Sequence, residues 1–388
     1  MSAPWSQWFK NRASTLALAS RDGIANHLSN PMRPSLLALT LLAFAPGPAA
    51  EPNQSSLTAT AMSPLLWTSL PDLPDREGFA GSFAGVTGGA LLVAGGANFP
   101  DKRPWEGGTK VWYDDTFLLT PNAPAWRRVD RLPAASGYGV SLTVNGGVLL
   151  IGGGDAKRNF AEVWHANWDG KRLTYTAWPA LPRPLAMMAG ACAGRFVYVA
   201  GGVDRPDATT AQRTAYVLDL DRVIAGWREL PPFPGVERIL PVAGATADAF
   251  YLFSGAHLIA DQTGKTSREW LRDAYRFTPS DGWQRLADLP RVAVAAPGLA
   301  PLVNGRLLVV GGDDGAQAAL APTAHRGFPR DILAYDPATD RWAQAGEVPF
   351  SLVTTPLTIW QGRLIVPGGE ARPGVRSPRV WTSTDTVR

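Results

Sequence analysis

The sequence is poor in cysteine and histidine and carries little charge. It has one cysteine and four histidines in 388 residues, and only 18% of its residues are charged. A single cysteine excludes an intramolecular disulfide, and the scattered histidines lack the paired spacing of a metal site. We therefore expect neither a metal nor a cofactor. The net charge of +4 comes without a dense run of Lys or Arg, so we expect no nucleic-acid partner.

The sequence also lacks an apolar run long enough to span a membrane as a helix. Its candidate, residues 36–44, is too short. This run follows the basic step Met32-Arg33 and precedes small residues at 47–50, which is the order of a secretory signal. We expect residues 1–60 to be a signal peptide or a disordered N-terminal segment, with Met32 as an alternative start. The signal predicts export to the periplasm and no other membrane contact.

Glycine, proline and tryptophan are abundant, with 40, 34 and 15 residues. Apolar runs end in a Gly-Gly or Ser-Gly step six times, at intervals of 49 to 57 residues. These steps are Gly95-Gly96, Gly152-Gly153, Gly201-Gly202, Ser254-Gly255, Gly311-Gly312 and Gly368-Gly369. A series of tryptophans keeps the same period: Trp67, Trp126, Trp178, Trp227, Trp283 and Trp342. A period of about 50 residues with this content is typical of a kelch-type propeller.

The apolar runs themselves predict an all-β fold. Residues 90–94 and 306–310 are short and apolar throughout most of their length, which indicates strands buried on both faces. One four-stranded sheet cannot bury two such faces, so neighbouring copies must stack in a closed ring. We predict a six-bladed kelch-type β-propeller over residues 61–388. An extra strand near 65–70, with no counterpart after the last copy, predicts that the N-terminal strand pairs with the C-terminal blade.

The last copy departs from the repeat because Glu370 follows its glycines directly. Arg376 stands across a Pro373-Gly374 turn. Loops at one end of a propeller converge on its axis, where a carboxylate and a guanidinium suit a general base and an anion clamp. A surface salt bridge across the turn is the alternative, and the charged positions Asp155 and Asp313 follow comparable glycines. Spacing alone leaves both interpretations open.

Two other stretches depart from a plain blade. The long connection after Gly96 brings Asn98, Arg103 and Trp105, a polar and aromatic set that suits a sugar or an anionic ligand. A solvated loop is the alternative. On a glycine-rich inner strand, Tyr138 either points its hydroxyl inward or packs against its neighbours.

Three segments resemble the N-acetylneuraminate epimerases, which are periplasmic kelch-propeller mutarotases of sialic acid. The segments are residues 78–85 with the Gly-Gly-Ala-Asn-Phe that follows, residues 138–142, and the string Glu-Ala-Arg-Pro-Gly-Val-Arg at 370–376. In the best-known members the glutamate blade precedes the Phe-Ala-Gly blade, whereas here it comes last. The chain therefore resembles a cyclically permuted branch of the family, and in a closed ring the permutation leaves the site intact.

The resemblance implies an isomerase that interconverts the α and β anomers of N-acetylneuraminate by acid–base ring opening and reclosure, without a cofactor. It implies that Glu370 is the catalytic base and that Arg376 binds the substrate carboxylate. Loop position adds Asn98, Arg103 and Tyr138 as substrate-binding residues. Two alternatives stay open: a non-catalytic periplasmic propeller that binds a glycan or a protein, and a mutarotase for another sugar acid. Neither the general acid nor the oligomeric state follows from the sequence.

Overall fold

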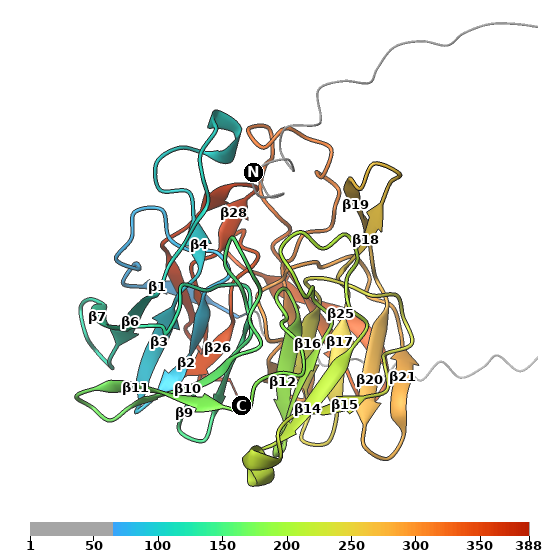
Figure 1. Ribbon diagram of the computed structural model, residues 1–388, viewed down its shortest axis with the longest axis horizontal. Coiled ribbons are helices and arrows are strands. Elements are labelled where there is room, and N and C mark those ends of the chain that lie inside the picture. The colour runs from blue at the N-terminus through green and yellow to red at the C-terminus, as the bar shows by residue number, and fades with distance from the viewer. Residues whose placement is uncertain (1–64, 388) are drawn as a thin grey trace, which may run out of the picture. The chain divides into compact units, whose positions relative to one another are not determined.

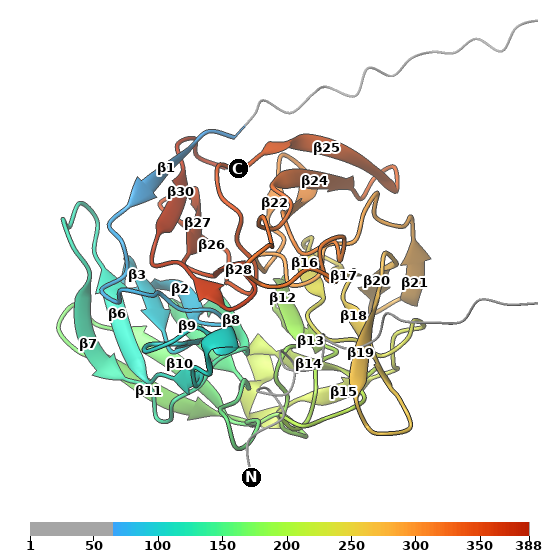
Figure 2. The same cartoon turned by 90° about the horizontal axis from the view of Figure 1, so that it is seen from above.

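The computed structural model describes residues 65–387, which form six four-stranded antiparallel sheets around a central axis (Figure 1, Figure 2). Helical structure within these residues is limited to two short 3-10 segments, η2 (Pro104–Glu106) and η3 (Leu220–Ala225). The predicted all-β class and the six blades are confirmed. The predicted signal within residues 1–60, with its alternative start at Met32, lies outside the described residues.

Blades 1 to 5 follow the chain from the innermost to the outermost strand. Blade 1 contains β2 (Phe83–Thr87), β3 (Ala90–Ala94), β6 (Asp115–Leu119) and β7 (Arg127–Arg131). Blade 2 contains β8 (Val140–Val144), β9 (Gly147–Ile151), β10 (Val163–Trp168) and β11 (Leu173–Trp178). Blade 3 contains β12 (Ala189–Ala193), β13 (Phe196–Ala200), β14 (Ala215–Asp219) and β15 (Arg228–Leu230).

Blade 4 contains β16 (Val242–Ala245), β17 (Phe250–Phe253), β20 (Ala274–Thr278) and β21 (Gly282–Leu286). Blade 5 contains β22 (Leu302–Val303), β23 (Arg306–Val310), β24 (Asp331–Asp336) and β25 (Arg341–Glu347). Blade 6 contains β26 (Thr358–Trp360), β27 (Arg363–Pro367), β30 (Val380–Ser383) and, as its outer strand, β1 (Trp67–Leu70).

The ring closes within blade 6, where the first strand of the described chain meets the last. The strands β1 and β30 are antiparallel, with Trp67 opposite Ser383 and Leu70 opposite Val380 (Figure 2). This pairing confirms the predicted exchange of strands between the two ends of the propeller. It leaves the propeller without an open seam between its first and last blades.

Three two-stranded hairpins extend the blades at one end of the ring, which we call the site face (Figure 1). They are β4 (Ala97–Asn98) with β5 (Val111–Trp112) in blade 1, β18 (Ala256–Ala260) with β19 (Thr266–Trp270) in blade 4, and β28 (Glu370–Arg372) with β29 (Val375–Arg376) in blade 6. Each hairpin begins directly after the Gly-Gly or Ser-Gly step of its blade. The glycine steps therefore mark the points where strands leave the repeat and reach the site face.

A circle of six backbone hydrogen bonds surrounds the axis. One residue just before each inner strand donates its N–H to the carbonyl of the equivalent residue in the preceding blade, with N···O distances of 2.7 to 2.9 Å. In chain order these residues are Gly81, Tyr138, Met187, Leu240, Ala295 and Thr354, and the bond from Gly81 to Thr354 closes the circle. All six have φ between 53° and 68°. A residue with a side chain loses about 1–2 kcal/mol in that region, so the assembled ring holds them there.

The tryptophan series joins neighbouring blades. Indole N–H groups donate to backbone carbonyls of the preceding blade: Trp126 to Pro71 (2.7 Å), Trp227 to Pro179 (2.9 Å), Trp283 to Pro231 (2.7 Å) and Trp342 to Ala287 (2.9 Å). A buried indole needs such an acceptor. The repeat in the sequence is therefore the repeat of an interface between blades.

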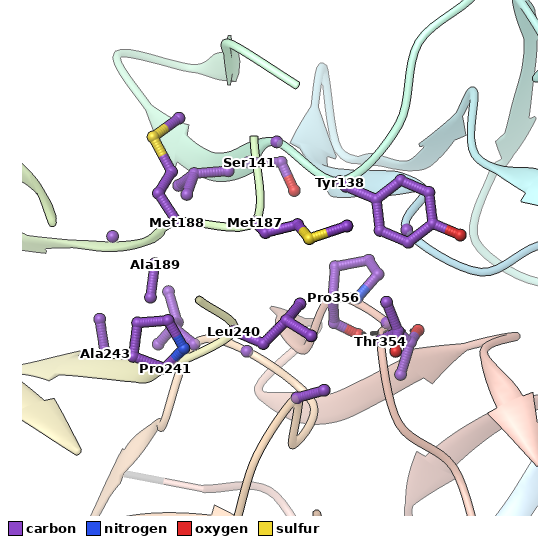
Figure 3. A pocket seen from close by; sticks show the side chains of 18 of the residues that line it. Tyr138, Ser141, Met187, Met188, Ala189, Leu240, Pro241, Ala243, Thr354 and Pro356 are labelled. Carbon is purple, nitrogen blue, oxygen red and sulfur yellow. Dashed lines mark hydrogen bonds between the residues drawn. The ribbon is translucent and has the colours of Figure 1, made fainter. Parts of the chain in front are cut away.

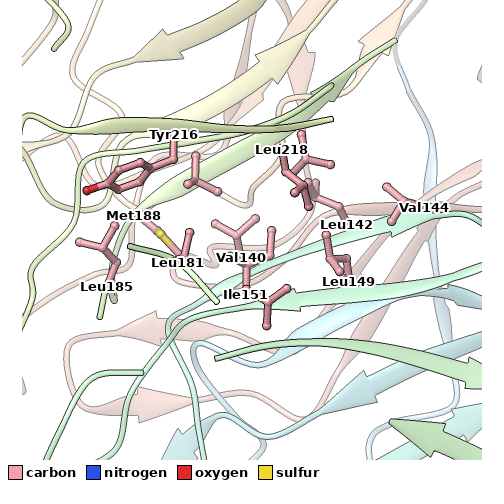
Figure 4. Close-up of a cluster of buried hydrophobic side chains, with 13 residues drawn as sticks. Val140, Leu142, Val144, Leu149, Ile151, Leu181, Leu185, Met188, Tyr216 and Leu218 are labelled. Carbon is pink, nitrogen blue, oxygen red and sulfur yellow. The ribbon is translucent and has the colours of Figure 1, made fainter. Parts of the chain in front are cut away.

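Apolar side chains fill the space between adjacent sheets. Between blades 2 and 3 a cluster includes Leu142, Leu149, Ile151, Tyr216 and Leu218, all buried (Figure 4). Every residue of β3 and of β9 is buried. This is the pattern of a strand covered on both faces, and it confirms why neighbouring copies must stack. No helix of residues 65–387 has the length and apolar character needed to cross a bilayer.

Candidate active site

The hairpin of blade 6 places Glu370 directly opposite Arg376. The two residues are partners in the register of β28 and β29. Arg376 Nη1 donates to Glu370 Oε1 at 2.9 Å, and the backbone N–H of Gly374 donates to the same oxygen at 2.7 Å. These two hydrogen bonds to Oε1 fix the orientation of the Glu370 side chain.

This pair is buried. The side chain of Arg376 is 4% exposed and that of Glu370 is 19% exposed. The guanidinium carbon lies 4.9 Å from the centre of the Phe99 ring, and Arg376 Nε donates to the carbonyl of Ala97 at 3.4 Å. The pair is thus not the surface salt bridge that the spacing also allowed. Burial strengthens the attraction between the charges and makes the loss of either partner costly.

The turn between Glu370 and Arg376 packs against blade 1. Gly374 has a φ of 80°, and a Cβ atom at this position would lie 2.5 Å from Cγ of Pro104 and 3.0 Å from the Trp105 ring. Pro104 and Trp105 belong to η2, within the long connection of blade 1. This connection therefore forms a wall behind the hairpin, and only glycine fits the contact.

The Tyr138 side chain lies beside the same pair. As a member of the axial circle, Tyr138 faces the cavity on the axis (Figure 3). Burial raises the pKa of Tyr138 to about 12, although the charge of Arg376 acts against this shift. Burial likewise acts to lower the pKa of Arg376, but Glu370 and Tyr138 outweigh it and the pKa is raised. At neutral pH the site therefore presents a guanidinium cation and an uncharged phenol.

A cavity that is open to solvent lies on the axis next to Tyr138 (Figure 3). It is lined by side chains of all six blades, mainly small or apolar, including Tyr138, Met187, Leu240, Ala295 and Thr354 of the axial circle. Glu370 and Arg376 do not line this cavity, but Tyr138 does, and Tyr138 interacts with both of them. A hollow that combines apolar side chains with a few polar groups is typical of a small-molecule site.

Lys110 joins the site although its sequence context gave no sign of it. Its Nζ lies 4.1 Å from the centre of the Tyr138 ring and 4.7 Å from that of Trp112. Burial lowers the pKa of Lys110 well below its usual value, and Arg376 acts in the same direction. The two rings favour the ammonium form, whereas burial and the nearby Arg376 favour the neutral amine.

Three further groups approach Glu370 from blades 4 and 5. Burial raises the pKa of Asp313, burial lowers the pKa of Arg268, and burial lowers the pKa of His325. The charge of Glu370 acts on all three. Arg268 comes from β19, whereas Asp313 and His325 come from the connection between β23 and β24. Asp313 had a visible signal, since it follows its glycine pair as Glu370 does, but Arg268 and His325 stand in no motif.

Asn98 and Arg103 lie nearby in other arrangements. Asn98 is fully buried, and its amide donates to Asp75 and to the carbonyl of Gly78 while it accepts from Tyr113. Arg103 pairs with Glu77 at 2.6 Å. The structure therefore brings Glu370, Arg376 and Tyr138 together, while Asn98 and Arg103 support the wall of blade 1. Contact of either residue with a substrate stays a prediction.

The described part of the chain holds no group of three or more His, Cys, Asp or Glu side chains suited to a metal ion. What it does hold is a carboxylate beside a guanidinium, a lysine and a phenol. Such a set can accept and return a proton while it binds an anion.

Comparisons with known proteins show the family to which this chain belongs. A family model described as N-acetylneuraminate epimerase matches residues 49–175 and 178–318. An N-acetylneuraminate epimerase from Haemophilus influenzae (strain PittEE) is 37% identical over 140 residues, which covers 32% of this chain and 36% of that protein. One from Yersinia enterocolitica is 31% identical over 231 residues, covering 53% and 56%. The chain thus spans about half or less of the length of these curated relatives.

A solved structure titled "Structure of YjhT" is similar in fold, with a TM-score of 0.58 at 14% identity, over 80% of this chain and 95% of that one. The family match ends at residue 318, before the hairpin that carries Glu370 and Arg376. A collinear alignment cannot follow a blade that has moved from one end of the chain to the other. This boundary is therefore what a cyclic permutation would produce, although the permutation itself stays a prediction.

Proposed function

Because this chain belongs to the N-acetylneuraminate epimerase family, we propose that it interconverts the α and β anomers of N-acetylneuraminate at the Glu370–Arg376 site. One observation carries the proposal: a largely buried carboxylate and guanidinium lie opposite each other on one hairpin and interact with Tyr138, which lines the axial cavity. A protein that only displayed a surface loop to a partner would not need to bury this pair.

Mutarotation needs a base, an acid and a site that holds the sugar. In the proposed reaction Glu370 takes the proton of the anomeric hydroxyl, the bond between the anomeric carbon and the ring oxygen breaks, and an acid protonates that oxygen. The open-chain ketone then turns about the bond next to the carbonyl and closes again on its other face. Each proton returns to its donor, so the reaction consumes nothing.

Arg376 binds the carboxylate of the sugar in this proposal. Its charge persists at every pH of interest because its pKa is raised above an already high value. A guanidinium can hold a carboxylate through two parallel hydrogen bonds, and it keeps Glu370 in place through its Nη1. Lys110 and its two aromatic neighbours lie near Arg376. We also propose that residues 1–60 direct the protein to the periplasm.

Proton NMR tests the proposal directly. The α anomer, freshly released from a sialoside, is mixed with the purified protein, and the two anomers are followed with time. We expect equilibration well above the rate in buffer, and a fall of about 10²–10⁴-fold in the catalysed rate for Glu370→Gln, since a positioned base contributes a factor of that size.

A wild-type rate equal to that in buffer would contradict catalysis on this sugar. If the sugar binds in a saturation-transfer experiment without faster equilibration, the chain is a binding propeller. If the anomers of another sugar acid equilibrate faster, the substrate assignment changes while the site stays.

A further inference from the structure

We infer that Asp313 is the general acid that protonates the ring oxygen, acting from blade 5, which is adjacent to blade 6 with the base Glu370. The inference rests on the proposed function and adds to it the identity of the second catalytic residue. It follows from the place of Asp313 in the ring, from the groups around it and from the way an anomeric carbon must be held.

The six blades present six equivalent positions at the site face. In each blade the residue after the Gly-Gly or Ser-Gly step forms a β-bridge with the residue just before the axial circle. In chain order these positions hold Ala97, Gly154, Val203, Ala256, Asp313 and Glu370. Four of them carry no ionisable group. The two that do are both acidic, and they belong to adjacent blades.

The backbone holds these two acids in the same way. Asp313 exchanges hydrogen bonds with Val294 at 2.8 and 2.9 Å, and Glu370 exchanges them with Val353 at 2.9 and 3.0 Å. Ala295 follows Val294, and Thr354 follows Val353. The N–H of Thr354 donates to the carbonyl of Ala295 at 2.7 Å, as part of the axial circle. The backbones of both acids are therefore held in the same way at neighbouring points of the circle, and the charge of Glu370 acts on Asp313.

The surroundings of the two acids differ in a way that suits opposite roles. Glu370 is bound by the Arg376 guanidinium and a backbone N–H. The groups that face Asp313 are Arg268 of the β18–β19 hairpin, its neighbour Asp314 and Glu370 itself. Burial raises the pKa of Asp313, with Asp314 and Glu370 acting in the same direction and Arg268 against them. Two acids whose environments differ in this way are a recurring acid–base arrangement.

The β18–β19 hairpin covers Asp313 on its outer side. The Trp270 ring lies against Gly315, where a Cβ atom would be 2.7 Å from the ring. The N–H of Gly315 in turn donates to Asp313 Oδ1 at 3.0 Å. The β18–β19 hairpin of blade 4 therefore helps to bury the Asp313 carboxyl group.

The geometry of the anomeric carbon assigns the roles. This carbon bears the carboxylate, the hydroxyl and the ring oxygen in three different directions. With the carboxylate at Arg376 and the hydroxyl at Glu370, the ring oxygen points away from the positive side of the site. Asp313 gives its proton to that oxygen as the carbon–oxygen bond breaks, and takes it back when the hydroxyl attacks the ketone again.

Lys110 is another candidate acid at the site. Its Nζ lies over the rings of Tyr138 and Trp112, next to Arg376 and the place of the carboxylate. The carboxylate of the sugar occupies that direction, so a lysine there assists in binding the anion. The two assignments differ in what Asp313→Asn and Lys110→Met do to the pH profile.

The test measures the anomerisation rate of N-acetylneuraminate by NMR across pH for the wild type, Asp313→Asn, Lys110→Met and the control Asp314→Asn. An acid works only below its pKa, so the wild-type rate should fall on the alkaline side, with the limb displaced upward from that of an ordinary aspartate. Asp313→Asn should lose about 10²-fold or more and lose this alkaline limb. Asp314→Asn should keep the rate and an alkaline limb, but the limb should lie at lower pH, because Asp314 helps to raise the pKa of Asp313.

The outcomes separate the two claims. If the wild type does not accelerate anomerisation, the proposed function fails and the acid assignment fails with it. If the wild type is active but Asp313→Asn keeps its rate and its alkaline limb, or Lys110→Met alone removes the limb, Asp313 is not the acid while the function stands. Should Asp313→Asn not fold, as judged by circular dichroism, Asp313→Glu decides: it must fold and keep a reduced rate with the limb present, and a rate without the limb overturns the assignment.

Discussion

A single buried ion pair determines what this site can do. Arg376 satisfies its charge with Glu370, stacks on Phe99 and bonds to the backbone of blade 1. Such a pair is weak evidence for stability, because desolvation offsets much of the attraction between the charges. Its retention on a hairpin next to the axial cavity is better explained by a role in binding and proton transfer.

Replacement of Arg376 by lysine tests whether substrate binding needs the planar guanidinium group or only a positive charge. Lysine keeps the charge but loses the planar fork, so we expect kcat/KM to fall by about 100-fold or more, chiefly through a higher KM. Anomer NMR at several substrate concentrations measures both parameters. The control is Arg372→Lys in the same hairpin, which should leave both near the wild-type values. An unchanged KM in Arg376→Lys would show that the substrate carboxylate binds elsewhere.

At the scale of secondary structure, three short hairpins distinguish this propeller from one that consists of four-stranded blades alone. The four-stranded blades repeat, whereas the hairpins β4–β5, β18–β19 and β28–β29 each start at a glycine step and reach the site face. They supply Glu370, Arg376 and Arg268, and β4 supplies the carbonyl that supports Arg376. A loop can vary without cost to the ring, so a rigid propeller can hold a specialised site.

The turn at Gly374 should tolerate no side chain. Gly374→Ala combines a φ of 80° with a clash against Pro104, so we expect a loss of about 1–3 kcal/mol in the free energy of unfolding together with reduced activity. Gly264→Ala is a matched control, since its φ is 79° and nothing lies within 4 Å of the added carbon. Urea unfolding and the NMR assay measure both variants. Equal losses in the two would mean that backbone strain alone, and not the contact with blade 1, is responsible.

At the scale of the whole molecule, closure of the ring brings the site together. The groups that meet near Glu370 come from blades 1, 2, 4, 5 and 6, and they converge only because the blades surround one axis. Blade 6 contributes both the hairpin of the site and the seam of the ring, where β1 pairs with β30. Stability of the seam and function of the site are thereby linked.

Removal of β1 should open this seam. A chain that starts after Leu70 leaves the edge of β30 unpaired, and we expect its Tm to fall by roughly 5–10 °C and the protein to associate through the free edge. Thermal unfolding and size-exclusion chromatography measure the two effects. A peptide with the sequence of residues 64–72 should restore the Tm when added in trans, whereas a scrambled peptide should not. An unchanged Tm in the shortened chain would show that β1 is dispensable.

The sequence by itself determined the architecture, because each blade of a propeller makes the same kinds of contact with the same kinds of residue. Glycine steps recur at the ends of the second strands, and four of the six tryptophans donate hydrogen bonds to the preceding blade, so period and spacing were enough to predict six blades and the closing strand. The Glu370–Arg376 pair was visible for a related reason: both residues lie on one short hairpin, where spacing along the chain predicts proximity.

Only the tertiary structure decided which other side chains join them. Asp313 and Glu370 are 57 positions apart in the sequence and become neighbours because the ring sets equivalent positions side by side. Lys110 and Arg268 stand in no motif, since charge and burial at a convergent site depend on contacts from several blades. Asn98 shows the converse: this polar residue of the long connection turned inward, because the partly buried Asp75 and the carbonyl of Gly78 accept hydrogen bonds from its amide.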